Sequence, residues 1–139
     1  MKPVLLKTRF LRSLRNRKGE VLLRRDLAGW ASPSQLTRTL QVMLSRGVIV
    51  RLGYGVYAKA KPSLLSGLPV PRQPLEVLAS ETFQRLAIPA APGGALQAYA
   101  QGSSPQIPMQ AVFRTGNVRC NRRLGVGSRT IRYERNQRV

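Results

Sequence analysis

The side chains that most often carry out enzyme chemistry are scarce in this sequence. It contains no histidine and a single cysteine, Cys120. Five carboxylates are spread along the chain, at Glu20, Asp26, Glu76, Glu81 and Glu134. A serine, threonine or cysteine nucleophile therefore has no histidine base to activate it. The carboxylates lack metal-ligand spacing, and neither a phosphate-binding glycine loop nor a paired-cysteine zinc motif occurs. We expect no enzymatic activity, no catalytic residue, no metal and no cofactor.

The charged groups that are abundant are basic. Lys and Arg number 24 against 5 Asp and Glu, which gives a formal net charge of +19. Residues 1–61 alone hold 14 basic and 2 acidic side chains, a net charge of +12. Such an excess destabilises a compact monomer by self-repulsion, and a polyanion relieves it. The composition therefore predicts a phosphate-rich partner, although a basic surface can also be a solvated face without a partner.

Neither an export signal nor a membrane span is expected. Lys7, Arg9 and Arg12 interrupt the apolar residues near the N-terminus, so no signal-type apolar run remains. Residues 86–113 are uncharged, but prolines and glycines break them repeatedly. One cysteine cannot form an internal disulfide, which suits a reducing compartment. We expect a cytoplasmic protein that does not associate with membranes.

The element that could present polar groups to nucleic acid is a helix that begins after Ser32. Ser32 is a natural N-cap, Pro33 suits the first helical position, and Gln35 completes a capping box. Gly47 predicts the end of the helix. Its apolar residues fall on one side, at Leu36, Leu40, Met43 and Leu44. Its polar residues fall on the other side, at Ser34, Arg38, Gln41 and Ser45.

Polar side chains of this helix are suited to reading bases. A guanidinium can pair with guanine through two hydrogen bonds, and a carboxamide can do so with adenine. We predict base contacts from Ser34, Gln35, Thr37, Arg38 and Gln41. The alternative is that this side of the helix is merely solvated. The near absence of carboxylates and the hairpin that follows favour contact with double-stranded DNA.

The preceding and following segments predict a winged helix-turn-helix over residues 1–61. Residues 4–15 suit a basic amphipathic helix, residues 20–30 suit a second helix, and Gly53 to Gly55 permit a tight hairpin. We predict phosphate contacts from the hairpin and the first helix, at Arg51, Tyr54, Tyr57, Lys59, Lys7, Arg17 and Lys18. Alternatively the hairpin only closes the core, and the two roles are compatible.

The second half predicts a smaller α+β region after a proline-rich linker at residues 62–74. Residues 75–139 would form a helix over 75–87, a small-residue segment over 92–101 and a three-stranded antiparallel meander. The expected strands lie near residues 109–114, 118–124 and 129–135. The arginines of this sheet can be a solvated face, a second nucleic-acid surface or a site for an acidic protein. The fold class is therefore predicted as α+β.

Three segments carry a family resemblance. They read "RRDLAGWASPSQLTRTLQVMLSRGVIVRLGYGVYAKAKPS", "IPAAPGGALQAYAQGSSPQIPMQAVFRTGN" and "GSRTIRYERN". Together they resemble the AbiEi-type antitoxins of type IV toxin-antitoxin systems. The likeness covers most of residues 20–136. By this likeness, Arg38, the helix that holds it and the hairpin at residues 51–57 match the DNA-reading portion.

The resemblance implies a bacterial or phage-encoded repressor of its own operon. Such antitoxins bind inverted repeats, which suits a homodimer, and they counteract a nucleotidyltransferase-like toxin encoded next to them. Many relatives continue into further helices beyond the "YERN" strand, so a free-standing regulator, or a fragment of a longer protein, fits equally well. Three other functions stay open: a basic RNA-binding or ribosome-associated protein, a toxin-neutralising protein-binding module without its own operator and, as the weakest alternative, a nuclease.

Overall fold

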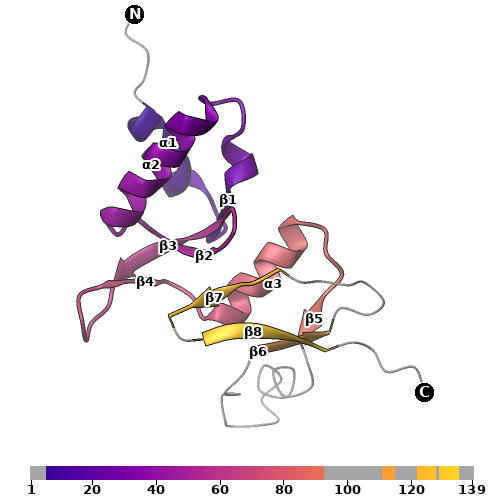
Figure 1. The fold of residues 1–139 in the computed structure, drawn as a ribbon. Coiled ribbons are helices and arrows are strands. Elements are labelled where there is room, and N and C mark those ends of the chain that lie inside the picture. Colours follow the sequence, from indigo (N-terminus) through magenta and orange to yellow (C-terminus); the bar gives the residue numbers. More distant parts are fainter. Residues whose placement is uncertain (1–5, 93–110, 115–121, 128, 135–139) are drawn as a thin grey trace, which may run out of the picture. The chain divides into compact units, whose positions relative to one another are not determined.

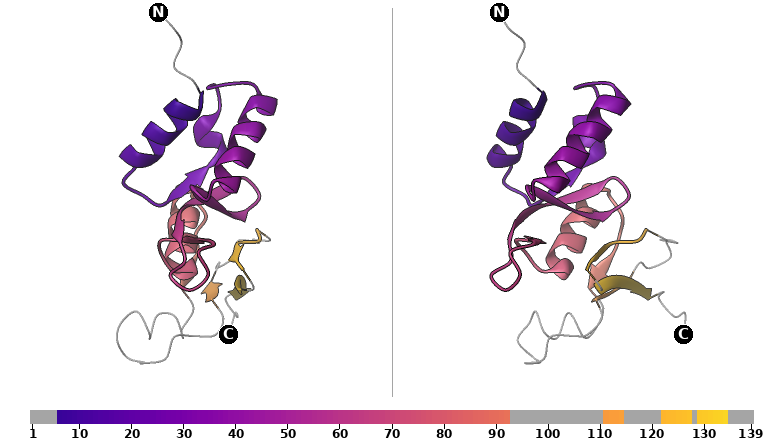
Figure 2. Two further views of the ribbon diagram at one scale, coloured as in Figure 1. Left: turned by 90° about the vertical axis from the view of Figure 1, so that its left-hand side faces the viewer. Right: turned by 60° about the vertical axis from the view of Figure 1, so that its left-hand side comes forward.

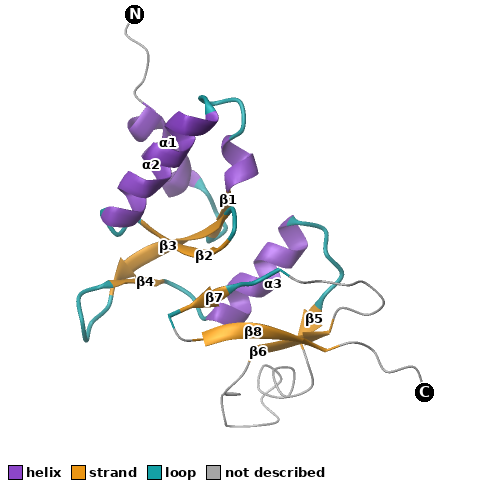
Figure 3. Cartoon of the chain, viewed as in Figure 1, coloured by secondary structure: helices purple, strands orange, loops and turns teal. Residues whose placement is uncertain are grey.

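A computed structural model describes residues 6–92, 111–114, 122–127 and 129–134 (Figure 1). The chain divides into two compact units. The first comprises Met1–Arg51 and Gly55–Arg72, and the second comprises Leu52–Tyr54 and Gln73–Val139. Three α-helices and two small sheets occur in the described ranges, so the predicted α+β class is confirmed (Figure 3).

The first unit alternates helices and strands. Its elements are α1 (Leu6–Asn16), β1 (Val21–Leu23), the 3-10 helix η1 (Arg24–Leu27), α2 (Pro33–Ser45), β2 (Ile49–Gly53), β3 (Val56–Pro62) and β4 (Pro69–Pro71). The last two residues of β2, Leu52 and Gly53, are grouped with the second unit, as is Tyr54 in the turn that follows. The strand order is β1-β3-β2, and β4 also pairs with β3. Helices α1 and α2 lie on the same side of this sheet (Figure 2).

Both helices bury apolar faces in one core with the sheet. The helix predicted over residues 4–15 is confirmed as α1, which buries Phe10 and Leu14. The core cluster consists of Phe10, Leu14, Leu22, Leu27, Leu36, Leu40, Met43, Ile49 and Tyr57. Because this cluster draws on α1, α2 and all three main strands, the position of α2 depends on packing along most of the first unit.

The second helix predicted over residues 20–30 is wrong. Residues Val21–Leu23 form β1, which pairs antiparallel with β3, and only Arg24–Leu27 form a single 3-10 turn. All three β1 side chains are buried. A short continuous apolar run fits a buried strand as well as a helix, and the backbone partners available on β3 decide for the strand. The Lys59 amide, for example, donates to the Glu20 carbonyl at 3.0 Å.

The segment predicted as a linker, residues 62–74, is partly structured. Pro69–Pro71 form β4, with Pro69 opposite Pro62 and Pro71 opposite Ala60 on β3. Proline is confined to edge strands because it cannot donate a ladder hydrogen bond, and β4 pairs with β3 alone in the described ranges. The proline-rich stretch therefore extends the first unit as far as Arg72.

The second unit packs one helix on a four-stranded sheet. Its elements are α3 (Leu75–Arg85), β5 (Ala91–Pro92), β6 (Ala111–Arg114), β7 (Gly125–Val126) and β8 (Arg129–Glu134). The predicted helix is confirmed, although it ends two residues before the expected residue 87. The Phe83 ring of α3 lies edge-on to Phe113, with centroids 5.2 Å apart, and to Tyr133, at 6.0 Å.

The predicted antiparallel meander is wrong. The strand order is β5-β6-β8-β7, and β6 and β8 run parallel, with Ala111 opposite Ile131. Residues 122–124 form no strand, and the rest of the expected strand over 118–124, together with the 92–101 segment beyond Pro92, lies outside the described residues. A parallel pair needs a crossover connection rather than a tight turn. Alternation along a strand predicts its buried face and leaves the direction of its partner open.

Candidate nucleic-acid interface

Helix α2 begins with the capping box that the sequence predicts. The Ser32 hydroxyl accepts a hydrogen bond from the Gln35 amide at 3.3 Å, and Gln35 Oε1 accepts one from the Ser32 amide at 3.1 Å. Pro33 occupies the first turn. At the other end Gly47 has a φ of +73°, a conformation that glycine adopts without strain. The boundaries of α2 are therefore set by its own sequence.

The two sides of α2 differ in burial as expected. Leu36, Leu40 and Met43 are buried, and Leu44 packs against the core from a half-buried position. The polar face of α2, as we call it, consists of the exposed residues Ser34, Thr37, Arg38, Gln41 and Ser45. This face carries no carboxylate. The described part of the chain leaves it uncovered, so its polar groups can meet a partner.

Gln35 differs from the other residues predicted to contact bases. Its side chain is exposed, but its carboxamide oxygen holds the Ser32 amide in the cap. A base contact through that oxygen would compete with the capping hydrogen bond. Arg38 and Gln41 have no such engagement with the helix start, and they are the longest side chains of the polar face.

The hairpin of β2 and β3 follows α2 directly. Its turn contains Gly55 with a φ of +68°, and Tyr54 beside it is 84% exposed. Arg51 on β2 is also exposed. The tip and the outer strand of the predicted wing therefore present one aromatic and one cationic side chain.

Tyr57 and Lys59 are not on the surface of the wing. Each is only 8% exposed, and Tyr57 belongs to the core cluster. The reason is the place of β3 in the sheet, between β1 on one side and β2 on the other. A central strand has its backbone edges paired and its side chains covered on the packed face. The sequence prediction that these two residues contact phosphates is therefore not supported by their positions.

Lys59 and Arg17 have internal partners instead. The Lys59 ammonium donates to the Arg17 carbonyl and lies 3.9 Å from Glu20 Oε2. Arg17 Nη1 donates to Asp26 Oδ2 at 3.1 Å, and the same oxygen accepts the Leu23 amide at 3.0 Å. These contacts tie the loop after α1 to the sheet. Of the predicted phosphate contacts on the first helix and its loop, Lys7 and Lys18 are exposed.

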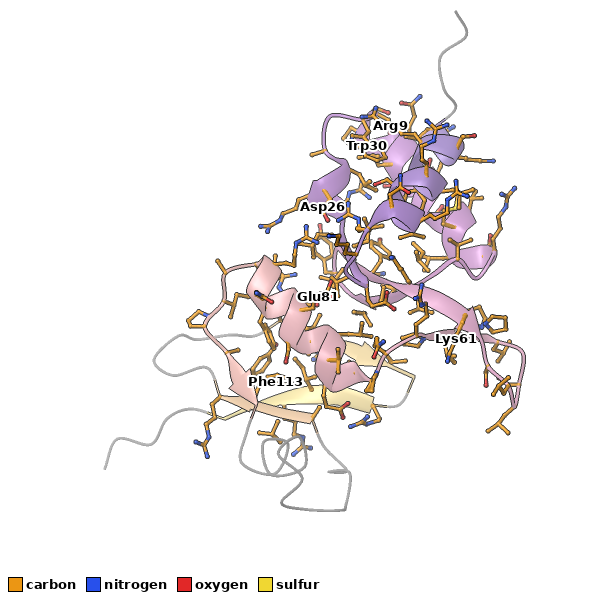
Figure 4. The ribbon with its side chains drawn as sticks, turned by 180° about the vertical axis from the view of Figure 1, so that it is seen from behind. Arg9, Asp26, Trp30, Lys61, Glu81 and Phe113 are labelled. Carbon is orange, nitrogen blue, oxygen red and sulfur yellow. The ribbon has the colours of Figure 1, made fainter. Side chains whose placement is uncertain are left out.

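Both carboxylates of the first unit are thus paired with cations. Glu20 also has Arg72 Nε at 3.2 Å from its Oε1. Asp26, which is labelled in Figure 4, is paired with Arg17. Among the described residues of this unit, the exposed cations are Lys7, Arg9, Arg12, Arg15, Lys18, Arg25, Arg38, Arg46, Arg51, Lys61 and Arg72. With the acidic groups already engaged, the outer charge of the unit is almost wholly positive, which suits a polyanionic partner.

Two arginine contacts were missed by sequence reasoning. The Arg9 guanidinium lies over the Trp30 ring, 4.1 Å from its centroid, and joins α1 to the segment before α2 (Figure 4). Arg24 Nη2 donates to the Pro33 carbonyl at 2.9 Å in the first turn of α2. No local sequence pattern predicts either contact, because each joins residues from different elements.

Within the ranges given above, no three His, Cys, Asp or Glu side chains gather in a way that could hold a metal ion. None of the helices described is both long and apolar enough to cross a membrane.

Comparison with known proteins identifies the family of this chain but gives no activity. No curated protein matches the sequence significantly, so the likeness to AbiEi-type antitoxins rests on the three quoted segments alone. A family model does match, over residues 9–138, which includes most of α1, the polar face of α2, the hairpin and nearly all of the second unit. The chain therefore belongs to DUF6088, a family of unknown function.

Proposed function

We propose that this protein binds double-stranded DNA through a winged helix-turn-helix, formed by the first unit together with the hairpin turn at Leu52–Tyr54, and represses transcription. The observation that carries the proposal is the uncovered, carboxylate-free polar face of α2, whose opposite side is buried. The order α1, β1, η1, α2, β2, β3 supports it, because a winged helix places its recognition helix directly before the hairpin.

In this arrangement α2 enters the major groove. Arg38 and Gln41 would contact base edges, while Ser34 and Thr37 near the helix N-terminus would contact bases or phosphates. Arg51 and Tyr54 on the hairpin would lie along the sugar-phosphate backbone. Lys7 and Lys18 would add phosphate contacts. The capping box matters here because it orients the first turn of α2 before DNA arrives.

The antitoxin role is the finer part of the proposal. It is supported by the resemblance of the three quoted segments to AbiEi-type antitoxins, which repress their own operons at inverted repeats. A homodimer would then place two copies of α2 about one helical turn apart on the DNA. The cognate partner would be a nucleotidyltransferase-like toxin, and co-expression of a toxin encoded next to this gene tests that step.

Direct binding measurements test the DNA proposal. The full chain is titrated by fluorescence anisotropy with three kinds of nucleic acid. These are duplexes selected from a random 20-bp library, the DNA upstream of the gene, and an RNA of equal length. We expect the selected duplex to bind at least tenfold more tightly than random duplex or RNA. The double variant Arg38→Ala, Gln41→Ala should lose that preference, whereas Arg132→Ala on β8 should retain it. Equal affinity for RNA and duplex would contradict the proposal.

A further inference from the structure

A second surface feature of the first unit lies away from the polar face of α2. It is an open groove of about 630 Å³ between α1 and β3, completed by Val48 and Arg72, and no α2 residue lines it. We call it the α1 groove. Its volume is within the range of about 300 to 1,000 Å³ that is typical of sites for small molecules. The winged-helix proposal assigns this groove no role.

The cationic lining of the α1 groove comes from two places. Arg12 and Arg15 lie three residues apart on α1, so both point to the same side of the helix. Both are exposed, and neither guanidinium group has a hydrogen bond or ion pair with another described residue. Lys59 and Arg72 also line the groove, but both are paired with Glu20. Lys59 Nζ lies 3.9 Å from Glu20 Oε2, and Arg72 Nε lies 3.2 Å from Glu20 Oε1. The two α1 guanidinium groups are therefore the ones available to an anion.

The rest of the lining is largely apolar. Leu11 and Leu14 come from α1, Val48 precedes β2 and Ala60 belongs to β3. Leu11 is 37% exposed, which leaves part of its side chain in contact with solvent. A nucleic-acid phosphate backbone would pair with the two arginines but would leave these apolar side chains in contact with water. A ligand that covers both needs a charged end and an apolar body.

We propose that the α1 groove binds a small amphipathic organic anion. Its carboxylate, sulfonate or phosphate group would lie between Arg12 and Arg15, where two guanidinium groups can share one anion. Its apolar body would lie on Leu11, Val48 and Ala60 and remove them from water. This site is separate from the DNA-contacting residues proposed above, so its test does not depend on DNA binding.

The probe for this site is 8-anilinonaphthalene-1-sulfonate, which joins a sulfonate to an apolar ring system. Its fluorescence is titrated against the folded full chain, beside the uncharged N-phenyl-1-naphthylamine, which lacks the sulfonate. We expect one site for the sulfonate and at least tenfold weaker binding of the uncharged compound. Equal binding of the two compounds would overturn the proposal, because the arginines would then contribute nothing.

Charge-matched and size-matched variants locate the site. The double variant Arg12→Ala, Arg15→Ala should weaken sulfonate binding at least tenfold. The control double variant Arg38→Ala, Arg46→Ala removes the same charge outside the groove and should change sulfonate binding less than twofold. Leu11→Ser should weaken binding at least fivefold, and Leu64→Ser, at a leucine outside the groove, should not. All six substituted residues are exposed, and circular dichroism verifies that each variant folds. Equal losses in the matched pairs would refute a localised site.

Discussion

The Lys59 ammonium and the Glu20 carboxylate form an ion pair inside the first unit, with 3.9 Å between Nζ and Oε2. Both side chains are largely buried. The same ammonium donates to the Arg17 carbonyl, and Arg72 Nε lies 3.2 Å from the other carboxylate oxygen of Glu20, Oε1. A basic residue that the sequence assigns to DNA is therefore part of the internal structure of the protein.

Replacing Lys59 should affect folding more than DNA binding. Lys59→Ala leaves Glu20 with one partner fewer in a largely buried position, and we expect a loss of about 2 to 4 kcal/mol in the free energy of unfolding. Lys61→Ala is the matched control, because Lys61 lies two residues further along β3 and is exposed (Figure 4). It should change the stability by less than about 0.5 kcal/mol. Urea unfolding followed by circular dichroism measures both, and similar losses would contradict a structural role for Lys59.

The start of α2 offers a second stability test. Ser32→Ala removes the hydroxyl that accepts the Gln35 amide, and we expect a loss of about 1 kcal/mol. Ser34→Ala changes an exposed serine two residues later, outside the cap, and should be nearly neutral. Thermal unfolding of the two variants and the wild type compares them. An unchanged midpoint for Ser32→Ala would show that the core alone sets the position of α2.

Arg38 and Arg51 should differ in the kind of DNA binding they support. Arg38→Ala should weaken binding to a preferred duplex by about 1 to 3 kcal/mol and leave binding to random duplex nearly unchanged, because base contacts carry the preference. Arg51→Ala should weaken both duplexes alike, because backbone contacts carry no sequence information. Anisotropy titrations with both duplexes measure the difference. Equal losses on both DNAs for both variants would argue against this division.

Salt should weaken DNA binding steeply. If roughly six phosphates are neutralised by the exposed cations of the first unit, log affinity against log salt concentration should have a slope of about −5. Removing Lys18, which is exposed, should make the slope shallower by about one unit. Titrations between low and moderate salt give the slope directly. A flat response would contradict phosphate binding altogether.

Much of α2 could be predicted from the sequence because its determinants are local. The reciprocal contacts of Ser32 and Gln35 join residues three positions apart, and Gly47 ends the helix by its own backbone freedom. The same holds for the buried faces of α1 and α3, whose apolar spacing follows the helical period. Net charge, and with it the class of partner proposed, is a property of composition alone.

The tertiary structure decided whatever depends on a distant partner. Val21–Leu23 form a strand because β3 offers them backbone hydrogen bonds, and β8 runs parallel to β6. Lys59 is buried while Lys61, on the same strand, is exposed, because β3 is covered along only part of its length. In each case the energy comes from contacts between residues far apart in the chain. Local propensity cannot encode such contacts, so which cations are exposed and which are buried is determined only once the sheet is assembled.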